Sequence, residues 1–393
     1  MLNRLEAQSP DALLALIKLF NADPRPDKID LGVGVYRTAD GATPVFAAIK
    51  DAEARLVAEQ ASKSYLGPEG DMGFVNGLVP HIFGDATPAA GRMDGMQTPG
   101  GTGAVRLALA LAKAAGATRV LMGTPSWPNH AQILADLDLE LVGFSHAASD
   151  GSADMAALRS ALANAGEGDA VLLHGCCHNP TGVDYTHAEW DEIAQLLSDS
   201  PVLPVIDLAY QGLGDGMEED AYGVRAVTKA CSEVLVAYSC DKNFGLYRDR
   251  VGAFYAITGD AEATKRAMSN AASLARANWS MPPDHGGAAV RLILEDAAMS
   301  AKWQDELASM RARIAEVRAA LAAASNAGGV NLEPLGRQKG MFGMLPVSKE
   351  QVQRLRDEHG VYMAGSGRIN VAGLTLGNIE QFIAALAAVT AEG

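Results

Sequence analysis

A lysine follows directly after an apolar run near the middle of the chain, in the stretch VLVAYSCDKNFGLYRDR, residues 234–250. Burying a lysine costs free energy, so an amine at the end of a strand that leads to an interior indicates a chemical use. An amine of this kind can form a Schiff base with an aldehyde. Lys242 is therefore the first candidate catalytic residue.

Four apolar runs in the chain are each followed by polar or aromatic side chains. In open α/β sheets, ligands bind outside the carboxyl ends of the strands, so we expect these side chains at one rim. A glycine-rich helix start, TPGGTG at 98–103, adds backbone N–H groups that favour a phosphate. The side chains are Ser239 and Lys242, Asp207 and Tyr210, His178 and Asn179, and Trp127 and His130.

This set of groups matches what pyridoxal phosphate chemistry requires. Lys242 supplies the amine, and Asp207 supplies a carboxylate that keeps the pyridine nitrogen protonated, so that the ring acts as an electron sink. Tyr210 and Asn179 can both donate to the phenolic oxygen of the ring. Trp127 offers a flat face for stacking.

The phosphate of such a cofactor also has candidate partners. Arg250, Ser239 and the helix start at Gly100 to Thr102 can hold it, the arginine by charge-assisted hydrogen bonds. Each residue taken alone also has an ordinary structural explanation: an aspartate can cap a helix, and a lysine can lie in a solvated loop. The convergence of four strand ends favours the functional interpretation.

The elements that must position these groups alternate along the chain. Short apolar runs are separated by amphipathic stretches such as 187–200, which predicts a largely parallel sheet with helices on both faces. We find no clear strand before the glycine-rich helix at 98–116, which argues against a dinucleotide fingerprint. The predicted strands are 118–123, 139–144, 169–175, 201–207, 233–239 and 251–257.

Length and periodicity predict how the chain divides. With 393 residues the chain exceeds the usual size of one core, so we expect two domains. A long helix through Trp303 and Leu321 is expected to connect them. We place a large cofactor-binding domain at 46–310 and a small domain at 1–45 plus 311–393. Ser9 and Pro10 predict the start of an N-terminal helix.

Charge and composition exclude several classes of partner. The formal net charge of −15 repels nucleic acid and anionic membranes, and the chain has no apolar run long enough for a membrane span. The four cysteines suggest neither a disulfide framework nor a metal site, which favours a cytoplasmic location. We therefore expect small-molecule ligands, with no nucleic acid or membrane as partner.

Several motifs, in order along nearly the whole chain, carry a family resemblance. The chain resembles the class I aspartate and aromatic-amino-acid aminotransferases. The resemblance implies a fold-type I pyridoxal 5'-phosphate enzyme, with a mostly parallel seven-stranded sheet in a large domain and a smaller α/β domain. It also implies a homodimer with shared active sites. The motifs include YLGPEGD, TPGGTGAVRLA, TPSWPNH, HGCCHNPTGVD, IDLAYQGLGDGMEEDA, KNFGLYRDRVGAF, RANWSMPPDHGG and GSGRINVAG.

The matching motifs also imply roles for individual residues around the cofactor ring. Lys242 is the Schiff-base lysine and the general acid/base of the proton shift. Asp207 pairs with the pyridinium nitrogen, assisted by His130, while Asn179 and Tyr210 bind the ring oxygen.

The same resemblance assigns the anion-binding groups. Arg368 pairs with the α-carboxylate of the substrate, helped by Gly34, Trp127 and Asn179. Arg276 of the partner subunit receives the side-chain carboxylate of dicarboxylic substrates. The residues implied for the phosphate are Gly101, Thr102, Ser239, Arg250 and Tyr65 of the partner subunit.

One position departs from the family pattern. The family usually has a small residue immediately before the lysine, where this chain has Asp241. Because adjacent residues point in opposite directions, we expect Asp241 to face away from the amine, toward Arg248.

The substrate and the reaction type leave alternatives open. Arg276 argues for dicarboxylates, whereas Met281, in place of a polar residue, favours aromatic or broad specificity. We expect amino transfer from aspartate or aromatic amino acids to 2-oxoglutarate. The alternatives are a pyridoxal-phosphate-dependent β-decarboxylase or lyase and a non-catalytic regulator. A dehydrogenase lacks its fingerprint here.

Overall fold

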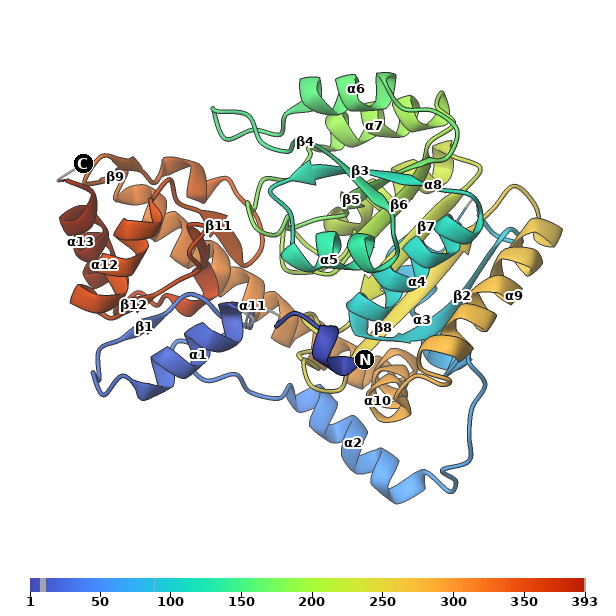
Figure 1. Cartoon of the computed structure of the whole chain (residues 1–393). Coiled ribbons are helices and arrows are strands. Elements are labelled where there is room, and N and C mark those ends of the chain that lie inside the picture. Colours follow the sequence, from blue (N-terminus) through green and yellow to red (C-terminus); the bar gives the residue numbers. More distant parts are fainter. Residues whose placement is uncertain (8–11, 88, 392–393) are drawn as a thin grey trace. The chain divides into compact units, whose positions relative to one another are not determined.

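The computed structural model describes residues 1–7, 12–87 and 89–391, and these form two compact units (Figure 1). The sheet unit comprises Pro44–Arg313 and Gln338–Gly340. The terminal unit comprises Met1–Thr43, Ile314–Arg337 and Met341–Gly393. The predicted helix start at Ser9 and Pro10 lies outside the described residues.

The sheet unit contains one seven-stranded sheet with the order β2-β8-β7-β6-β5-β3-β4. Strands β3 to β7 pair in parallel, whereas β8 runs antiparallel to both of its neighbours. All six predicted runs are strands, and the predicted α/β class with a mostly parallel sheet is confirmed. The strands are β2 (Met93–Pro99), β3 (Arg119–Thr124), β4 (Glu140–Ser145), β5 (Asp169–His174), β6 (Leu203–Leu208), β7 (Val234–Ser239) and β8 (Val251–Ile257).

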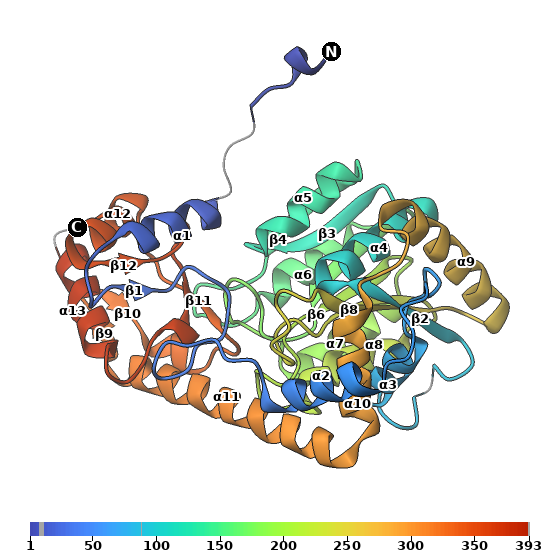
Figure 2. The same ribbon diagram turned by 90° about the horizontal axis from the view of Figure 1, so that it is seen from below.

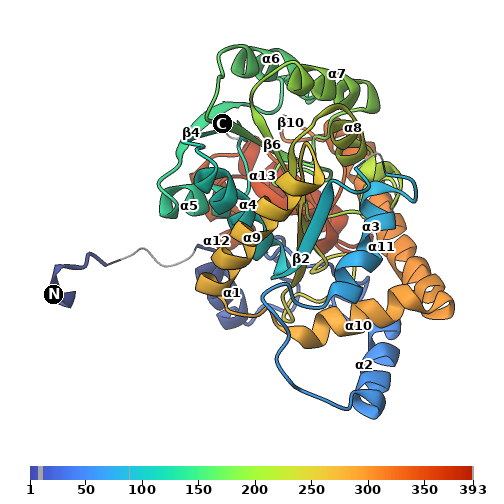
Figure 3. The same cartoon turned by 90° about the vertical axis from the view of Figure 1, so that its right-hand side faces the viewer.

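The central strands are apolar on both faces because helices cover both sides of the sheet. Every residue of β7 and of β8 is buried. Helices α4, α5 and α9 cover one face, and α6, α7 and α8 cover the other (Figures 1 and 3). These helices are α4 (Gly100–Ala114), α5 (Pro128–Asp136), α6 (Met155–Ala163), α7 (His187–Ser198), α8 (Tyr222–Ala230) and α9 (Ala261–Asn278).

Three further helices pack together at the antiparallel side of the sheet. Helix α10 (Asp284–Glu295) contacts both α2 (Ala47–Glu59) and α3 (Met72–Phe83), as Figure 2 shows. The predicted long helix is α11 (Ala297–Ala323), whose residues from Ile314 onward belong to the terminal unit. Its predicted apolar positions, from Trp303 to Leu321, are all buried.

The segment before the glycine-rich helix is a strand, contrary to the prediction from the sequence. Strand β2 ends at Pro99, directly before α4, and pairs antiparallel with β8 along its whole length. Its sequence, MDGMQTP, contains an exposed aspartate and a glycine, so it lacks the apolar pattern that marks the other strands.

The terminal unit has its own apolar core, to which the last turns of α11, two C-terminal helices and several short strands contribute side chains. Strand β1 pairs in parallel with β12, so the N-terminal segment joins a sheet with C-terminal residues. The elements are α1 (Ala12–Ala22), α12 (Lys349–His359), α13 (Ile379–Thr390), β1 (Ile29–Asp30), β9 (Asn326–Ala327), β10 (Val330–Asn331), β11 (Phe342–Met344), β12 (Val361–Tyr362) and β13 (Arg368–Asn370). Within the described residues, none of the helices combines the length and the apolar character that a membrane crossing requires.

Candidate active site

The carboxyl ends of β3, β5, β6 and β7 bring most of the predicted residues of the sheet unit to one rim. These strands are neighbours and run in the same direction, so the segments that follow them share one edge. Asn179 Nδ2 donates to the Tyr210 hydroxyl at 3.4 Å, and Lys242 Nζ lies 5.2 Å from the centre of the Tyr210 ring. The predicted convergence of these side chains is therefore present in the fold.

Asp207 is the first member of a partly buried chain of polar groups. Its Oδ2 lies 2.9 Å from Nε2 of His130, whose side chain is fully buried. His130 Nδ1 lies 3.0 Å from Ser126 Oγ, which in turn lies 3.0 Å from His174 Nε2. Burial holds the pKa of His174 well below its usual value, so this imidazole is neutral. The chain fixes the orientation of the Asp207 carboxylate.

Two buried oxygens at the rim have no hydrogen-bond partner among the described residues. They are Oδ1 of Asp207 and Oδ1 of Asn179. The whole Asp207 residue is only 6% exposed, so water reaches this carboxylate poorly. An ionised carboxylate with one free oxygen in such a place favours a cationic or N–H donor as its ligand.

Contacts with Tyr238 and Trp303 anchor the turn that carries Lys242. Asn243 donates from its side chain to the Tyr238 hydroxyl at 2.9 Å and accepts on its backbone oxygen from Trp303 Nε1 at 2.7 Å. Phe244 stacks on Trp303 with ring centres 4.3 Å apart. Desolvation lowers the pKa of Lys242, although the charges of Asp241 and Asp207 oppose this effect. A larger neutral fraction makes the amine a better nucleophile and base.

The residues that are predicted to bind the phosphate lie around the N-terminus of α4. This helix has no side-chain cap, so the backbone N–H groups of its first turn are free to meet an anion. A Cβ on Gly101 would lie 2.7 Å from Cβ of Ser239, so only glycine permits the close approach of this helix to β7. Thr102 is half-buried in the same turn, and Ser239 is 1% exposed.

Asp241 does not lie where the sequence analysis expected it. Its carboxylate pairs with Arg250, the predicted phosphate ligand, whereas Arg248 is exposed. Asp241 Oδ1 also accepts the backbone N–H of Val251 at 3.2 Å. The alternation rule fails because Asp241 lies in a turn after β7, where side chains no longer alternate across a sheet.

Trp127 and two further predicted residues of the sheet unit lie nearer to solvent. Trp127 precedes α5 and contacts His130 edge to face, with ring centres 5.0 Å apart. Tyr65 is 94% exposed, and Arg276 is exposed with a hydrogen bond to Ser280. Neither of these last two contacts the rim through any interaction that the structure records.

Gly34 and Arg368 belong to the terminal unit, where they share one neighbour. Arg368 Nη2 donates to the Gly32 oxygen at 2.9 Å, and its guanidinium lies 4.7 Å from the centre of the Phe342 ring. A Cβ on Gly34 would come within 3.1 Å of the same ring. Asn370 holds this loop by donating to the backbone oxygens of Val33 and Val35.

Sequence reasoning missed two members of the partly buried polar chain, Ser126 and His174. A signal existed for both: Ser126 precedes His130 by four residues, and His174 is the last residue of β5. It also missed the anchoring of the lysine turn by Trp303, which comes from a distant helix.

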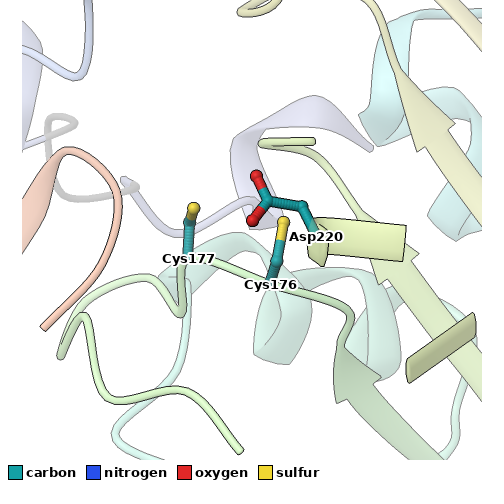
Figure 4. Close-up of side chains that lie close together, drawn as sticks. All are labelled: Cys176, Cys177 and Asp220. Carbon is teal, nitrogen blue, oxygen red and sulfur yellow. The ribbon is translucent and has the colours of Figure 1, made fainter. Parts of the chain in front are cut away.

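Two adjacent thiols, Cys176 and Cys177, lie within 4.8 Å of a carboxylate oxygen of Asp220 (Figure 4). The Asp220 carboxylate accepts backbone N–H groups from Gly212, Gly214 and Asp215 at 2.8–2.9 Å. Burial raises the pKa of Cys176 well above its usual value, so this thiol is protonated. Within this cluster, Asp220 therefore supports the loop of residues 212–215.

Comparisons with known proteins agree with this geometry. Residues 26–386 match the model of the family described as aminotransferase class I and II. The chain is 49% identical to a tyrosine aminotransferase of Rhizobium meliloti (strain 1021), over 95% of this chain and 96% of that protein. It is 42% identical to an aspartate aminotransferase of Salmonella typhi, over 99% of this chain and 100% of that protein.

A solved structure extends the comparison to the cofactor. The aromatic-amino-acid aminotransferase of Burkholderia pseudomallei, covalently bound to pyridoxal phosphate, superposes with a TM-score of 0.95 at 35% identity, over 99% of each chain. Such agreement over the full length requires the same fold, and the rim carries the groups that this cofactor needs. The chain belongs to the class I and II aminotransferase family and is a pyridoxal-phosphate-dependent aminotransferase.

Proposed function

We propose that this enzyme transfers the amino group of aromatic amino acids and of aspartate to 2-oxoglutarate. The observation that carries this proposal is the rim itself, where Lys242, Tyr210 and Asn179 converge beside the buried Asp207. The names of the tyrosine and aspartate aminotransferases that resemble the chain support both classes of donor.

The residues at the rim fit pyridoxal phosphate on structural grounds. Asp207 Oδ1 is buried without a partner among the described residues, as a ligand for a protonated ring nitrogen should be. The uncapped start of α4 and the close approach at Gly101 form a cradle for the phosphate. When bound, pyridoxal phosphate supplies an aldehyde that condenses with amines and a ring that withdraws electrons.

The chain's own residues then hold and move protons. Asp207, oriented by His130, keeps a proton on the ring nitrogen, because an ionised carboxylate in a poorly hydrated site favours a cation beside it. Lys242 Nζ would take the proton from the α-carbon of the amino acid and pass a proton to the bound cofactor, and in the second half-reaction it would carry a proton back to the α-carbon of the 2-oxo acid. Its lowered pKa suits it to this role. Asn179 and Tyr210 donate to the ring oxygen.

We assign the remaining predicted residues to anion binding. Gly101, Thr102, Ser239 and Arg250 are assigned to the cofactor phosphate, and Arg368, Gly34 and Trp127 to the α-carboxylate of the substrate. Arg368 suits this role because its guanidinium is already oriented by the Gly32 oxygen and the Phe342 ring. On this proposal the sheet unit is the cofactor domain and the terminal unit is the small domain.

We infer that the working enzyme is a homodimer in the cytoplasm. Tyr65 and Arg276 are exposed in this chain, as residues that complete the site of a partner subunit should be. All four cysteines are buried and none of them forms a disulfide in the described part of the chain, which suits a reducing compartment.

Spectroscopy of the full-length enzyme tests the proposed reaction. Addition of phenylalanine or aspartate alone should change the absorbance of the bound cofactor, and addition of 2-oxoglutarate should restore it. Catalytic turnover without 2-oxoglutarate would instead indicate a decarboxylase or lyase, and a preparation without a bound chromophore would contradict the proposal.

Substitution of Arg276 by leucine separates the two classes of donor. The proposal expects kcat/KM for aspartate to fall by about 100-fold, because a side-chain carboxylate loses a charge-assisted partner. For phenylalanine we expect a change of less than about threefold, since its ring needs no cation. Equal losses for both donors would contradict the role of Arg276.

A further inference from the structure

We call the part of the rim formed by Ser239, Arg250 and the start of α4 the phosphate end. Asp241 lies there, although the cofactor site does not by itself require a carboxylate at this position. Its side chain is 2% exposed, and its two oxygens accept from the Arg250 guanidinium and from the backbone N–H of Val251. Its own backbone N–H donates to Ser239 Oγ at 3.2 Å. One residue therefore contacts two of the side chains assigned to the phosphate.

The carboxylate also lies against the helix start. A Cβ built on Gly100 would lie 2.5 Å from Arg250 Nη2 and 3.0 Å from Asp241 Oδ2. Arg250 has a left-handed backbone conformation, with φ at 57°, and its Nη1 also donates to the Tyr247 oxygen. Such a conformation persists only where surrounding contacts hold it. Asp241 is one of these contacts.

Two opposing consequences follow for an anion that enters this end of the rim. Asp241 fixes the guanidinium in place, which lowers the entropy that Arg250 loses on binding. It also occupies Nη1 of that guanidinium and places a negative charge beside the incoming phosphate, where low solvent access strengthens repulsion. The second effect outweighs the first, because Arg250 is already restrained by its backbone and by the Tyr247 oxygen.

We propose that Asp241 is a positioning residue that orients Arg250 and weakens the hold of the enzyme on the cofactor phosphate, a restraint that is lifted when its carboxyl takes up a proton. This inference rests on the proposed cofactor site. It assigns to Asp241 the control of how readily the cofactor dissociates.

The direction of the pH dependence follows from the groups that face Asp241. Burial raises its pKa, whereas the cations Lys242 and Arg250 and the Val251 N–H oppose this rise. The other neighbours, Cys240, Ser239 and the start of α4, carry no formal charge here. A bound phosphate favours the protonated carboxyl, so the penalty that Asp241 imposes on cofactor affinity is smallest at low pH and grows as the pH rises through the pKa of Asp241.

Equilibrium dialysis of the full-length holoenzyme tests the proposal. Asp241→Asn keeps the shape of the side chain and an oxygen that can accept from Arg250, but removes the charge. Asp241→Ser removes both. In each variant the Kd of pyridoxal phosphate should fall about tenfold at neutral pH. The Kd of pyridoxal, which lacks the phosphate, should change less than about twofold.

Asp169 provides a matched control. It is a buried aspartate that pairs with Arg119 through two hydrogen bonds of 2.7–2.8 Å, at the amino end of β5 and therefore at the opposite edge of the sheet. Asp169→Asn should leave the Kd of pyridoxal phosphate and its pH dependence unchanged. Relative to wild type, Asp241→Asn should flatten that pH dependence.

Two outcomes would overturn the inference while leaving the proposed function intact. The first is an Asp241→Asn enzyme that binds pyridoxal phosphate no more tightly than wild type, and the second is an equal gain for pyridoxal. A wild-type chain that binds neither compound would overturn the proposed function and the inference together.

Discussion

Two buried aspartates stand at the carboxyl ends of neighbouring strands, yet their surroundings are opposite. Asp207, on β6, has one oxygen 2.9 Å from Nε2 of His130, and its second oxygen has no partner among the described residues. Asp241, after β7, has both oxygens engaged, one of them by a guanidinium. At the part of the rim around Asp207, which we call the ring end, a carboxylate oxygen is therefore available to accept from a cation. The phosphate end has a cation that is already partly neutralised.

The difference shows how one rim can bind the ring and the phosphate of a cofactor with unequal strength. A carboxylate with a free oxygen in a poorly hydrated place gains most when a proton is held beside it. An arginine shared with a carboxylate gains less from a further anion. We therefore expect changes at the ring end to alter the chemistry, and changes at the phosphate end to alter the affinity for the cofactor.

Asp207→Asn should give the largest effect, because it removes the charge that holds the ring proton. We expect the rate of the half-reaction with phenylalanine to fall by about 10³-fold at saturating cofactor. Stopped-flow absorbance measures this rate. Asp207→Glu, which keeps the charge, should recover part of the loss, and a rate within threefold of wild type for Asp207→Asn would contradict the role of this carboxylate.

Arg250→Gln should weaken cofactor binding by about 100-fold, because it removes a charge-assisted partner and leaves Asp241 beside the phosphate without its cation. Equilibrium dialysis of pyridoxal phosphate provides the measurement. In the double variant with Asp241→Asn, part of this loss should be recovered, because the repulsive charge is gone. Additive effects of the two substitutions would show that the residues do not act through one another.

Acid should destabilise the fold through a buried histidine cluster next to the Asp207 chain. Behind His174, the rings of His178 and His146 stack 3.5 Å apart, and desolvation lowers the pKa of His146 to about 4. An unfolded histidine titrates near 6.5, so the unfolded chain takes up a proton that the folded chain excludes. Stability is therefore fully present above about pH 6.5 and is lost as the pH falls toward 4.

His146→Gln tests this pH dependence directly. Glutamine can still donate to the Val183 oxygen, which His146 Nε2 meets at 2.8 Å, but it does not titrate. Between neutral pH and about pH 5, wild type should lose about 2 kcal/mol more unfolding free energy than the variant, measured by urea denaturation. Parallel losses in the two proteins would show that His146 does not titrate as inferred.

Ser126→Ala should produce the smallest effect. It removes the hydroxyl that links His130 to His174, but leaves the bond between His130 and Asp207. We expect the half-reaction rate to fall about fivefold, the size expected from a lost neutral hydrogen bond. The Kd of pyridoxal phosphate should stay within twofold of wild type, since Ser126 does not touch the phosphate end. A larger change in that Kd than in the rate would contradict the separation of the two ends.

The sequence predicted those features that depend on local pattern. The apolar runs identified six of the seven strands, because strands covered on both faces need continuous apolar residues. Strand β2 was not predicted because its position at the edge of the sheet tolerates polar residues and a glycine. The rim residues were predictable because parallel strands end at one edge.

What the sequence could not predict depends on the course of the chain after a strand ends. The alternation rule placed Asp241 toward Arg248, whereas the turn directs it to Arg250. The support of the lysine turn by Trp303 joins residues sixty positions apart, so no short motif carries it. His174 was visible as a strand end, but only its contact with Ser126 shows that it belongs to the Asp207 chain.

A side-by-side measurement of Asp207→Asn and Asp241→Asn tests the separation of the two ends most directly. At saturating pyridoxal phosphate, the half-reaction rate of Asp207→Asn should lie at least about 100-fold below that of Asp241→Asn. The Kd of pyridoxal phosphate should be lower for Asp241→Asn than for wild type or Asp207→Asn. Equal rates and equal affinities in the two variants would contradict the account.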